Sequence, residues 1–389
     1  MDRNGSSPTN GVNLGANGAL GATKKVRYAV VGLGHIAQVA VLPGFKHARD
    51  NSELTTLVSG DETKRAELSK KYKAANTYTY EQYDECLRSG NVDAVYIALP
   101  NDMHCEYTVR AAEAGMHVLC EKPMAVTENE CRRMIEACAA NNVRLMIAYR
   151  LHFEEANLEA AHVAKTQEIG EMRFFSSDFS QQVTADNIRM SRDKGGGTLY
   201  DIGVYCINAA RMLFRDEPTE VFAFSANNGA PRFREIDEMT SCILRFPNER
   251  LATFTCSFGA SPVAVYRLVG TRGDLRVEPS YPYAKRLEHY LTIDGKTRKR
   301  LFPKRDQFAP EILYFSKCIL EHKTPEPDGW EGLADVRIVQ ALYRSADAGQ
   351  PVPVDRVERE VRPILAQEIH RPPITKPKLV HAQSPSGSS

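Results

Sequence analysis

The sequence has no excess of charge of either sign, because its 389 residues contain 50 Lys and Arg against 49 Asp and Glu. This balance argues against a protein that coats nucleic acid or binds an anionic membrane surface, although a local basic cluster could still hold a small anion. The sequence also lacks an apolar run of the roughly 18 residues that a transmembrane helix needs. We therefore expect neither a nucleic-acid partner nor a membrane partner.

Paired or clustered cysteines are absent as well. The nine cysteines are scattered, with no C-x-x-C pair, and neither His nor Cys clusters at ligand spacing. Such a set is typical of reduced, buried thiols in a cytoplasmic protein, and it argues against a zinc site. We expect a cytoplasmic location and no bound metal.

The two ends of the chain lack the composition of folded elements. Residues 1–24 have few large apolar side chains and no basic start followed by an apolar block, so they do not resemble a secretory signal. They are expected to form a flexible N-terminal arm; the alternative is an arm that folds over a bound cofactor or a neighbouring subunit. Residues 355–389 are rich in Pro, Lys, Ser and Gly, which predicts a C-terminal surface tail.

The chain between these ends is 42% hydrophobic over the whole sequence, enough to bury a large core, and its length favours two domains. Strands alternate with helices over residues 25–148, which predicts a doubly wound parallel sheet of the Rossmann type. The expected strands there are 28–31, 54–59, 92–99, 117–120 and 144–149.

The pattern changes over residues 149–354, where strands follow one another without intervening helices. This indicates an α+β domain with a large, mostly antiparallel open sheet. The fold class is therefore α/β, with a second α+β domain for substrate binding and oligomerisation. Its expected strands are 172–179, 221–225, 238–246, 251–257, 263–269 and 274–277, and its expected helices are 154–166, 199–214, 310–322 and 332–348.

A dinucleotide fingerprint follows the first predicted strand. Gly32-Leu33-Gly34-His35-Ile36-Ala37 has the G-x-G-x-x-A spacing, with a strand before it and a helix-like segment after it. The first glycine permits the tight turn, the second lets the backbone approach a pyrophosphate, and the alanine keeps the helix close to the sheet. The phosphates would lie at the positive end of that helix.

A second stretch carries reactive side chains. In the segment from Gly195 to Asn208, Asp201 and Tyr205 are four residues apart, so on a helix they project from one face. The glycines before them would let this helix begin close to a ligand. Lys122 precedes a proline just past the end of a predicted strand, where open α/β sheets bind their ligands.

Together these motifs resemble the Gfo/Idh/MocA oxidoreductases over residues 26 to 352, and within that family the glucose–fructose and aldose–aldose oxidoreductase branch. The resemblance includes Leu-Pro-Gly-Phe at 42–45, Leu-Val-Ser-Gly at 57–60, Asp-Ala-Val-Tyr-Ile at 93–97, Glu-Lys-Pro-Met-Ala at 121–125, the glycine-rich stretch that begins at Gly195, and Asp-Val-Arg-Ile-Val-Gln-Ala-Leu from Asp335.

The resemblance implies hydride transfer between a sugar carbon and the nicotinamide, with Lys122, Asp201 and Tyr205 as the catalytic residues. Most of the family has His where this sequence has Tyr205; the glucose–fructose branch has Tyr. A phenol is a weak acid, so acting as a base near neutral pH requires a nearby cation, and Lys122 would stabilise the phenolate. Tyr205 would remove the O1 proton of the sugar, and Asp201 would orient Lys122 and the substrate.

The resemblance also implies the cofactor, which we predict to be NADP. The family's position for an acidic residue on the ribose 2′-hydroxyl is Ser59 here, and Lys64 and Arg65 lie one helical turn on, close enough to pair with a phosphate. Asp61 argues the other way, unless its carboxylate caps the helix.

The predicted cofactor contacts come from six places in the chain. For His104 the alternative is a structural hydrogen bond, and for Arg192, as for Arg189, an ordinary loop charge. The predicted set is Gly32, Leu33, Gly34, His35, Ile36, Ser59, Gly60, Lys64, Leu99, Pro100, Asn101, His104, Glu121, Lys122, Arg150 and Arg192.

The leading hypothesis is an NADP-dependent sugar oxidoreductase that converts C1 of an aldose to a lactone and keeps its cofactor bound for reoxidation by a second sugar. One alternative is a dehydrogenase or reductase with exchangeable cofactor, of the anhydrofructose or cyclitol type. Another is a non-catalytic NADP-binding regulator, which the intact set of Lys122, Asp201 and Tyr205 argues against. The family implies a homodimer or homotetramer formed through the second sheet.

Overall fold

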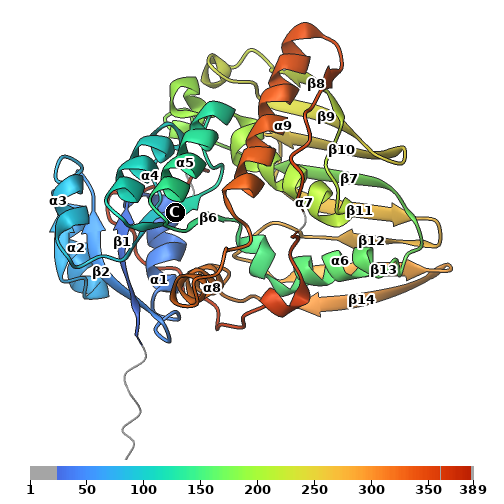
Figure 1. The fold of residues 1–389 in the computed structure, drawn as a ribbon. Coiled ribbons are helices and arrows are strands. Elements are labelled where there is room, and N and C mark those ends of the chain that lie inside the picture. The colour runs from blue at the N-terminus through green and yellow to red at the C-terminus, as the bar shows by residue number, and fades with distance from the viewer. Residues whose placement is uncertain (1–23, 360, 387–389) are drawn as a thin grey trace, which may run out of the picture.

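The computed structural model describes residues 24–359 and 361–386, so residues 1–23 of the predicted N-terminal arm lie outside the described residues. Two β-sheets organise the chain, one in each half of the view in Figure 1. This α/β arrangement confirms the predicted fold class. None of the helices in the described part of the chain has the length and apolar character that crossing a membrane demands.

The first sheet is parallel throughout, and its strand order is β3-β2-β1-β4-β5-β6. The chain leaves β1 and β4 in opposite directions, so a crevice opens at the carboxyl ends of these neighbouring strands, where doubly wound folds bind ligands. The strands are β1 (Val26–Val31), β2 (Ser52–Val58), β3 (Asn76–Tyr78), β4 (Ala94–Ile97), β5 (His117–Glu121) and β6 (Leu145–Ala148).

Helices cover both faces of this sheet and form two separate apolar clusters with it. One helix, α8, comes from the region that the sequence assigned to the second domain, yet it packs against β1 and β2. Helix α2 begins at its predicted cap, where Asp61 accepts a hydrogen bond from the Lys64 amide at 2.9 Å. The helices are α1 (Leu42–Gly44), α2 (Glu62–Tyr72), α3 (Tyr83–Arg88), α4 (His104–Glu113), α5 (Glu128–Ala140) and α8 (Ala309–Leu320).

The second sheet has nine strands in the order β14-β13-β12-β11-β7-β10-β9-β8-β15, and all its pairs are antiparallel except β7 with β10. Its strands are β7 (Met172–Ser180), β8 (Glu220–Ala226), β9 (Met239–Phe246), β10 (Arg250–Ser257), β11 (Val263–Gly270), β12 (Gly273–Val277), β13 (Leu287–Ile293), β14 (Lys296–Phe302) and β15 (Val352–Pro353).

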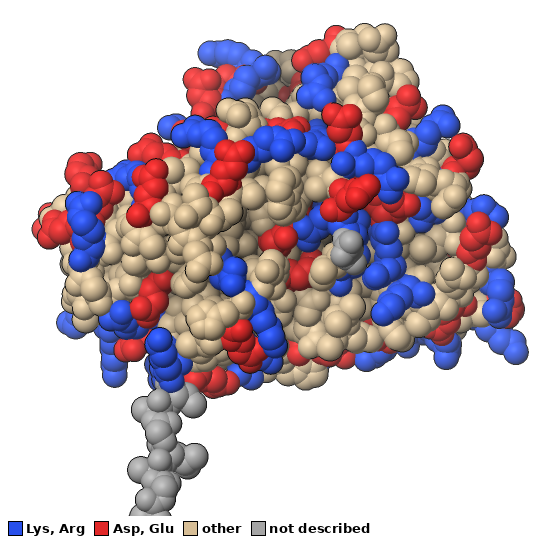
Figure 2. All heavy atoms as spheres, viewed as in Figure 1, with Lys and Arg blue, Asp and Glu red and all other residues tan. Residues whose placement is uncertain are grey.

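One face of the nine-stranded sheet is covered and the other is open. Helices α6 (Glu155–Lys165), α7 (Val204–Phe214) and α9 (Gly329–Ala348) pack on the covered face, as Figure 1 shows. On the open face Phe174 lies opposite Leu251, and both side chains are more than two-fifths exposed. The side of the molecule seen in Figure 2 carries basic and acidic side chains intermixed, in agreement with the balanced composition.

The elements that the sequence did not predict lie mainly at the edges of the sheets. β3 and β14 are edge strands, and β14 carries four basic residues in seven, a composition that blunts an edge but hides the period-two pattern of a strand. Arg300 of β14 pairs with Glu155 and Glu159 at 2.9 Å. The predicted helix 199–214 is also divided, because its first turn, Leu199–Gly203, is π-helical and only α7 is regular.

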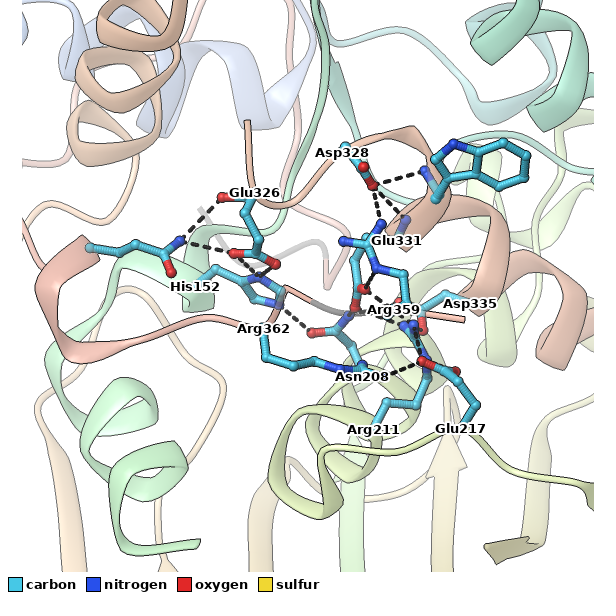
Figure 3. A network of polar contacts seen from close by, with 12 residues as sticks. His152, Asn208, Arg211, Glu217, Glu326, Asp328, Glu331, Asp335, Arg359 and Arg362 are labelled. Carbon is cyan, nitrogen blue, oxygen red and sulfur yellow. Dashed lines mark hydrogen bonds and ion pairs between the residues drawn. The ribbon is translucent and has the colours of Figure 1, made fainter. Parts of the chain in front are cut away.

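Beneath α7 lies a buried ionic network, shown in Figure 3. The Arg211 side chain is fully buried, and its guanidinium lies 2.7 Å from Glu217, 2.8 Å from Glu331 and 2.6 Å from Asp335. Arg362, from the C-terminal region, reaches the same Glu217 at 2.6 Å. The network therefore ties α7 to α9 and to the last part of the chain.

The region predicted as a surface tail packs against the folded chain. Gln367 is 9% exposed and donates to Glu326, while Leu379 and Val380 contact the apolar cluster beside β1. Only a few apolar and amide side chains make these contacts, so the average composition of the region does not reveal them.

Candidate active site

A cleft of about 1680 Å³ opens at the carboxyl ends of β1, β4 and β5 and extends to the start of α7. Pockets for small ligands are usually about 300–1,000 Å³, so this cleft has room for a dinucleotide and a second, smaller molecule. The cleft is lined by residues from both halves of the chain.

The glycine turn forms one end of the cleft. Gly32 has φ +94°, and a Cβ there would lie 2.5 Å from the carbonyl oxygen of Ala98, so the turn after β1 requires glycine. A Cβ on Gly34 would meet no atom within 4 Å, which leaves its backbone open to the cleft. The helix begins at His35, and the first amides of a helix have no partner within it. The turn therefore fits a pyrophosphate.

The charges around this turn are positive. Burial, together with nearby Arg189 and Lys376, lowers the pKa of His35 to about 4, so its imidazole is neutral at physiological pH. Cations that disfavour a second positive charge on His35 would favour a bound anion. The electrostatics and the geometry of the turn therefore agree.

A cluster of charged side chains lies where the two halves meet. Lys122 Nζ donates to the backbone carbonyl of Asp201 at 2.9 Å and lies 3.6 Å from Asp201 Oδ1. Arg189 Nε lies 2.7 Å from Oδ2 of the same carboxylate, and Gln181 donates to that oxygen at 3.0 Å. Burial would raise the pKa of Asp201, but Arg189 and Lys122 outweigh it and hold that pKa below its ordinary value.

Tyr205 lies between two cations. Lys122 Nζ lies 4.7 Å from the centre of its ring and the Arg150 guanidinium 5.0 Å. Phe179 and Tyr281 pack against the ring as well. Among residues 24–359 and 361–386, no group is hydrogen-bonded to the Tyr205 hydroxyl, although the residue lines the cleft. The phenol is held by its ring, and its oxygen is left for a ligand.

Two buried side chains support this cluster. Arg150 is 5% exposed and donates to the carbonyl oxygen of Tyr281 at 2.6 Å and to Gln307. Glu121 accepts a hydrogen bond from Tyr96 at 2.9 Å, and burial raises its pKa although Lys122 and Tyr96 act against this rise. These contacts hold Glu121, which precedes Lys122 in the chain, and Arg150, which lies beside the Tyr205 ring.

The glycines that precede Asp201 have a packing role. A Cβ on Gly196 would lie 2.4 Å from the Arg189 carbonyl oxygen, and one on Gly197 would lie 2.5 Å from the Tyr343 hydroxyl. The Asn101 side-chain amide donates to the Gly195 carbonyl at 2.9 Å. These glycines therefore admit neighbouring protein groups and close the loop around Arg189. Gly195 and Gly196 also line the cleft, so the expectation that they let the helix begin close to a ligand stays a prediction.

Comparison with known proteins identifies the family. Residues 26–149 match the model of an oxidoreductase family with an NAD-binding Rossmann fold, and residues 157–276 match the GFO/IDH/MocA C-terminal domain. The chain belongs to the Gfo/Idh/MocA oxidoreductase family. It is thus an oxidoreductase, as the resemblance of its motifs implied.

Relatives within the Gfo/Idh/MocA family match nearly their whole length. A protein named D-xylose 1-dehydrogenase [NADP(+)] from Haloarcula marismortui is 33% identical over 85% of this chain and 93% of its own. An aldose–aldose oxidoreductase from Caulobacter crescentus, solved with glycerol, is 34% identical with a TM-score of 0.81, covering 85% of this chain and 100% of its own. A 3-ketoreductase from Actinomadura kijaniata, solved with NADP and TDP-benzene, is 25% identical with a TM-score of 0.76, over 83% and 98%.

The structure brings most of the predicted site residues of this family member together. The three predicted catalytic residues line the cleft. The predicted cofactor contacts that line it are Gly32, Leu33, Gly34, His35, Ile36, Lys64, Leu99, Pro100, Asn101, His104, Glu121, Lys122 and Arg150. Their roles towards a cofactor stay predictions.

His104 lines the cleft but is occupied by protein groups. Its two ring nitrogens lie 3.0 Å from the carbonyl oxygens of Pro123 and Leu99, and burial lowers its pKa although these carbonyls act against the shift. The imidazole therefore clamps the segment after β4 to the segment after β5, as the structural alternative described.

Three predicted cofactor residues are not among those that line the cleft. Ser59 is 3% exposed and lies behind Tyr80, and Gly60 lies beside the same ring. The Arg192 side chain donates to the Glu235 carbonyl at 2.8 Å, because a short turn after Ser191 directs it outwards. Arg189 enters the cleft instead.

Sequence reasoning did not single out several lining residues. Gln181 and Phe179 come from the end of β7, and no motif marks them. His381 lies in the region read as a tail, and its position beside the cleft depends on the path of the chain after α9. A tertiary contact of this kind leaves no periodic signal.

Proposed function

We propose that the chain is an NADP-dependent sugar oxidoreductase that oxidises C1 of an aldose to a lactone. The cofactor is NADP. The observation that carries the proposal is Tyr205: it lines the cleft, its ring lies beside Lys122 and Arg150, and its hydroxyl has no protein partner among the described residues. The relatives named as a xylose dehydrogenase and an aldose–aldose oxidoreductase support a sugar as substrate.

The residues present fit each part of such a reaction. NADP, when bound, supplies the hydride acceptor at its nicotinamide ring. Tyr205 takes the O1 proton of the sugar as the C1 hydrogen leaves with its electron pair, and the C1–O1 bond becomes the carbonyl of the lactone. Lys122 stabilises the deprotonated phenol and binds a sugar hydroxyl.

Asp201 acts on the position of its neighbours. Its carboxylate holds Arg189 at 2.7 Å and Lys122 at 3.6 Å, so both cations stay directed into the cleft. A carboxylate kept ionised by two cations does not compete for the proton that Tyr205 receives. The arrangement separates a proton acceptor from the charges that hold it in place.

The proposal is tested by following absorbance at about 340 nm, where the reduced nicotinamide absorbs, with NADP⁺ and either D-xylose or D-glucose. An increase with an aldose is expected, and xylitol, which has no C1 hemiacetal, serves as the matched control. Equal oxidation of xylitol and D-xylose, or no absorbance change with a panel of aldoses, would contradict oxidation at C1.

The fate of the cofactor distinguishes two forms of this enzyme. We propose that it stays bound, so protein purified without added NADP⁺ should give the signal with an aldose and lose it when a second sugar is added. If the signal depends on NADP⁺ in solution at every turnover, the enzyme is instead a dehydrogenase with exchangeable cofactor.

We further propose a cytoplasmic homodimer or homotetramer formed through the open face of the second sheet. All nine cysteines are buried and none forms a disulfide, which suits a reducing compartment. The open face exposes Phe174, Phe224, Ile243 and Leu251, whose exposure in a single chain favours a covered interface. Light scattering of the purified protein would test the oligomer; a monomeric mass would contradict it.

A further inference from the structure

A C-terminal segment, residues 379–386, lies along the cleft and is here named the C-terminal strap. Its first anchor is Gln38, which is 1% exposed and follows the glycine turn. The Gln38 side chain accepts from the Val380 amide and donates to the Val380 carbonyl, both at 2.8 Å, and also donates to the carbonyl of Leu33 at 2.9 Å. A buried amide thus joins the strap to the fingerprint itself.

The second anchor involves the residue that argued against NADP. His381 Nδ1 lies 2.9 Å from Asp61 Oδ2. The other oxygen of Asp61 accepts the Lys64 amide at 2.9 Å as the cap of α2. Both carboxylate oxygens therefore have partners, and Asp61 stands just past the end of β2, where enzymes that bind NAD place an acid on the ribose 2′-hydroxyl.

The third anchor lies on the other half of the molecule. The Pro385 carbonyl accepts a hydrogen bond from the Thr184 amide at 3.0 Å, on the loop that follows β7. The strap therefore spans from the first sheet to the second. From the first anchor to the third, the cleft is lined by His381, Ala382, Gln383, Ser384 and Pro385. A dinucleotide on the fingerprint would lie beside this span.

The strap lies beyond the parts of the chain that the family models match, which end at residue 276. The aldose–aldose oxidoreductase from Caulobacter crescentus aligns over 100% of its own length and only 85% of this chain.

We propose that the C-terminal strap completes the NADP site: His381 pairs with Asp61 beside the 2′-phosphate, and the strap slows release of the cofactor. The inference rests on the proposed function in one respect, that NADP is the dinucleotide bound in the cleft. An uncompensated Asp61 carboxylate would repel a 2′-phosphate near Lys64, whereas a paired one leaves the lysine charge available. His381 is in this account a specificity-determining residue of the cofactor site.

The charge part is tested by the dissociation constants of NADP⁺ and NAD⁺ for the full-length protein, measured by titration calorimetry. His381→Ala should weaken NADP⁺ binding about tenfold and change NAD⁺ binding by less than about twofold. His381→Lys should retain the preference, because a lysine ammonium group can pair with Asp61 in its place. His370→Ala, a tail histidine outside the cleft lining, is the matched control and should change neither constant.

A double variant separates charge from structure. Asp61→Asn combined with His381→Ala should recover NADP⁺ affinity, because the carboxylate with which His381 pairs is then absent. If His381→Ala weakens both dinucleotides equally or neither, or if the double variant does not recover, the charge role is wrong. Failure of the wild-type protein to bind either dinucleotide would instead contradict the proposed function.

The retention part is tested by removing residues 379–389 and measuring NADP⁺ dissociation by stopped-flow displacement. The dissociation rate should rise about tenfold or more, with a circular dichroism spectrum like that of the full chain. An unchanged rate would contradict a retaining strap, and so would tighter NADP⁺ binding, which would mean that the strap competes for the site. Gln38→Ala, which removes the first anchor together with the hydrogen bond to the Leu33 carbonyl, should give a smaller increase and guards against a truncated protein that fails to fold.

Discussion

Two clusters of charge flank α7, and only one of them is open to solvent. In the cleft the side chains of Lys122 and Asp201 are 13% and 14% exposed, while below the helix the Arg211 side chain is fully buried. Every N–H group of the Arg211 guanidinium donates to a carboxylate, whereas the Tyr205 hydroxyl has no protein partner among the described residues. A dense cluster of charges therefore does not by itself mark a functional site. A polar side chain that lines a cleft and has no protein hydrogen-bond partner does.

Helix α7 carries residues of both the cleft and the buried network. Tyr205, Asn208 and Arg211 follow one another at three-residue intervals along α7, from the cleft into the protein interior. Asn208 accepts from His152 at 2.8 Å and donates to Glu331 and Asp335. The network thus holds the helix on which the proposed base is mounted.

The largest expected effect breaks the buried cluster. Arg211→Met leaves Glu217, Glu331 and Asp335 without their shared cation and should lower the free energy of unfolding by about 3–5 kcal/mol. Urea denaturation followed by circular dichroism measures it. The control is Arg173→Met, an exposed arginine paired with Glu171, which should cost less than about 1 kcal/mol. Equal costs would show that burial does not distinguish the two pairs.

A matched pair of substitutions removes the charge of one carboxylate from each cluster. Asp201→Asn should reduce kcat/KM for an aldose about 10²-fold, with the unfolding midpoint nearly unchanged, because Arg189 and Lys122 lose their common anchor. Asp335→Asn should lower the free energy of unfolding by about 2 kcal/mol while the folded protein keeps its activity. The same phenotype in both variants would remove the distinction between the clusters.

Much of this organisation could be predicted from the sequence. The fingerprint, the strand before it and the lysine after β5 are local patterns, and the structure places them at one edge of one sheet. Asp294-Gly295 between β13 and β14 is a recognisable hairpin signal, and both residues have positive φ. The charge-rich β14 gave no apolar alternation to detect.

Other features could not be predicted because they depend on tertiary contacts. The π-helical turn before α7 changes the spacing along the helix on which Asp201 and Tyr205 lie, and helical periodicity cannot reveal it. Arg189 and Arg192 are three residues apart in one loop, yet only Arg189 lines the cleft. Which of two loop arginines faces inwards is decided by packing around Gly196.

The two loop arginines provide a sharper test of the cleft. Arg189→Ala should weaken NADP⁺ binding and kcat/KM about tenfold, because the Asp201 carboxylate loses its closest cation. Arg192→Ala should change both by less than about twofold, since its guanidinium bonds Glu235 outside the cleft. Titration calorimetry and steady-state rates measure the effects. A larger loss from Arg192→Ala would restore that residue to the cofactor site.

The smallest expected effect concerns pH and the buried cluster. Burial lowers the pKa of His152, but the ion pair with Glu326 at 3.2 Å and the hydrogen bond to Asn208 outweigh it and raise that pKa above the unfolded value of about 6.5. The stabilisation is therefore complete below about pH 6.5 and is lost as the pH rises through the folded-state pKa.

The test of this pH effect compares the wild-type protein with His152→Gln by urea denaturation from pH 6 to 9. The stability difference, about 1 kcal/mol or more at the acid end, should shrink as the pH rises. A difference that grows with pH would contradict a charged His152. In contrast to His152, whose charge contributes to stability, the ionised carboxylate of Asp201 supports activity.

The account depends most directly on Tyr205. Stopped-flow absorbance at about 340 nm, with NADP⁺-loaded wild-type protein and Tyr205→Phe mixed with an aldose, measures hydride transfer in a single turnover. The account predicts that Tyr205→Phe binds NADP⁺ as tightly as the wild type and transfers hydride about 10²–10⁴-fold more slowly. Transfer at the wild-type rate with cofactor bound would contradict it.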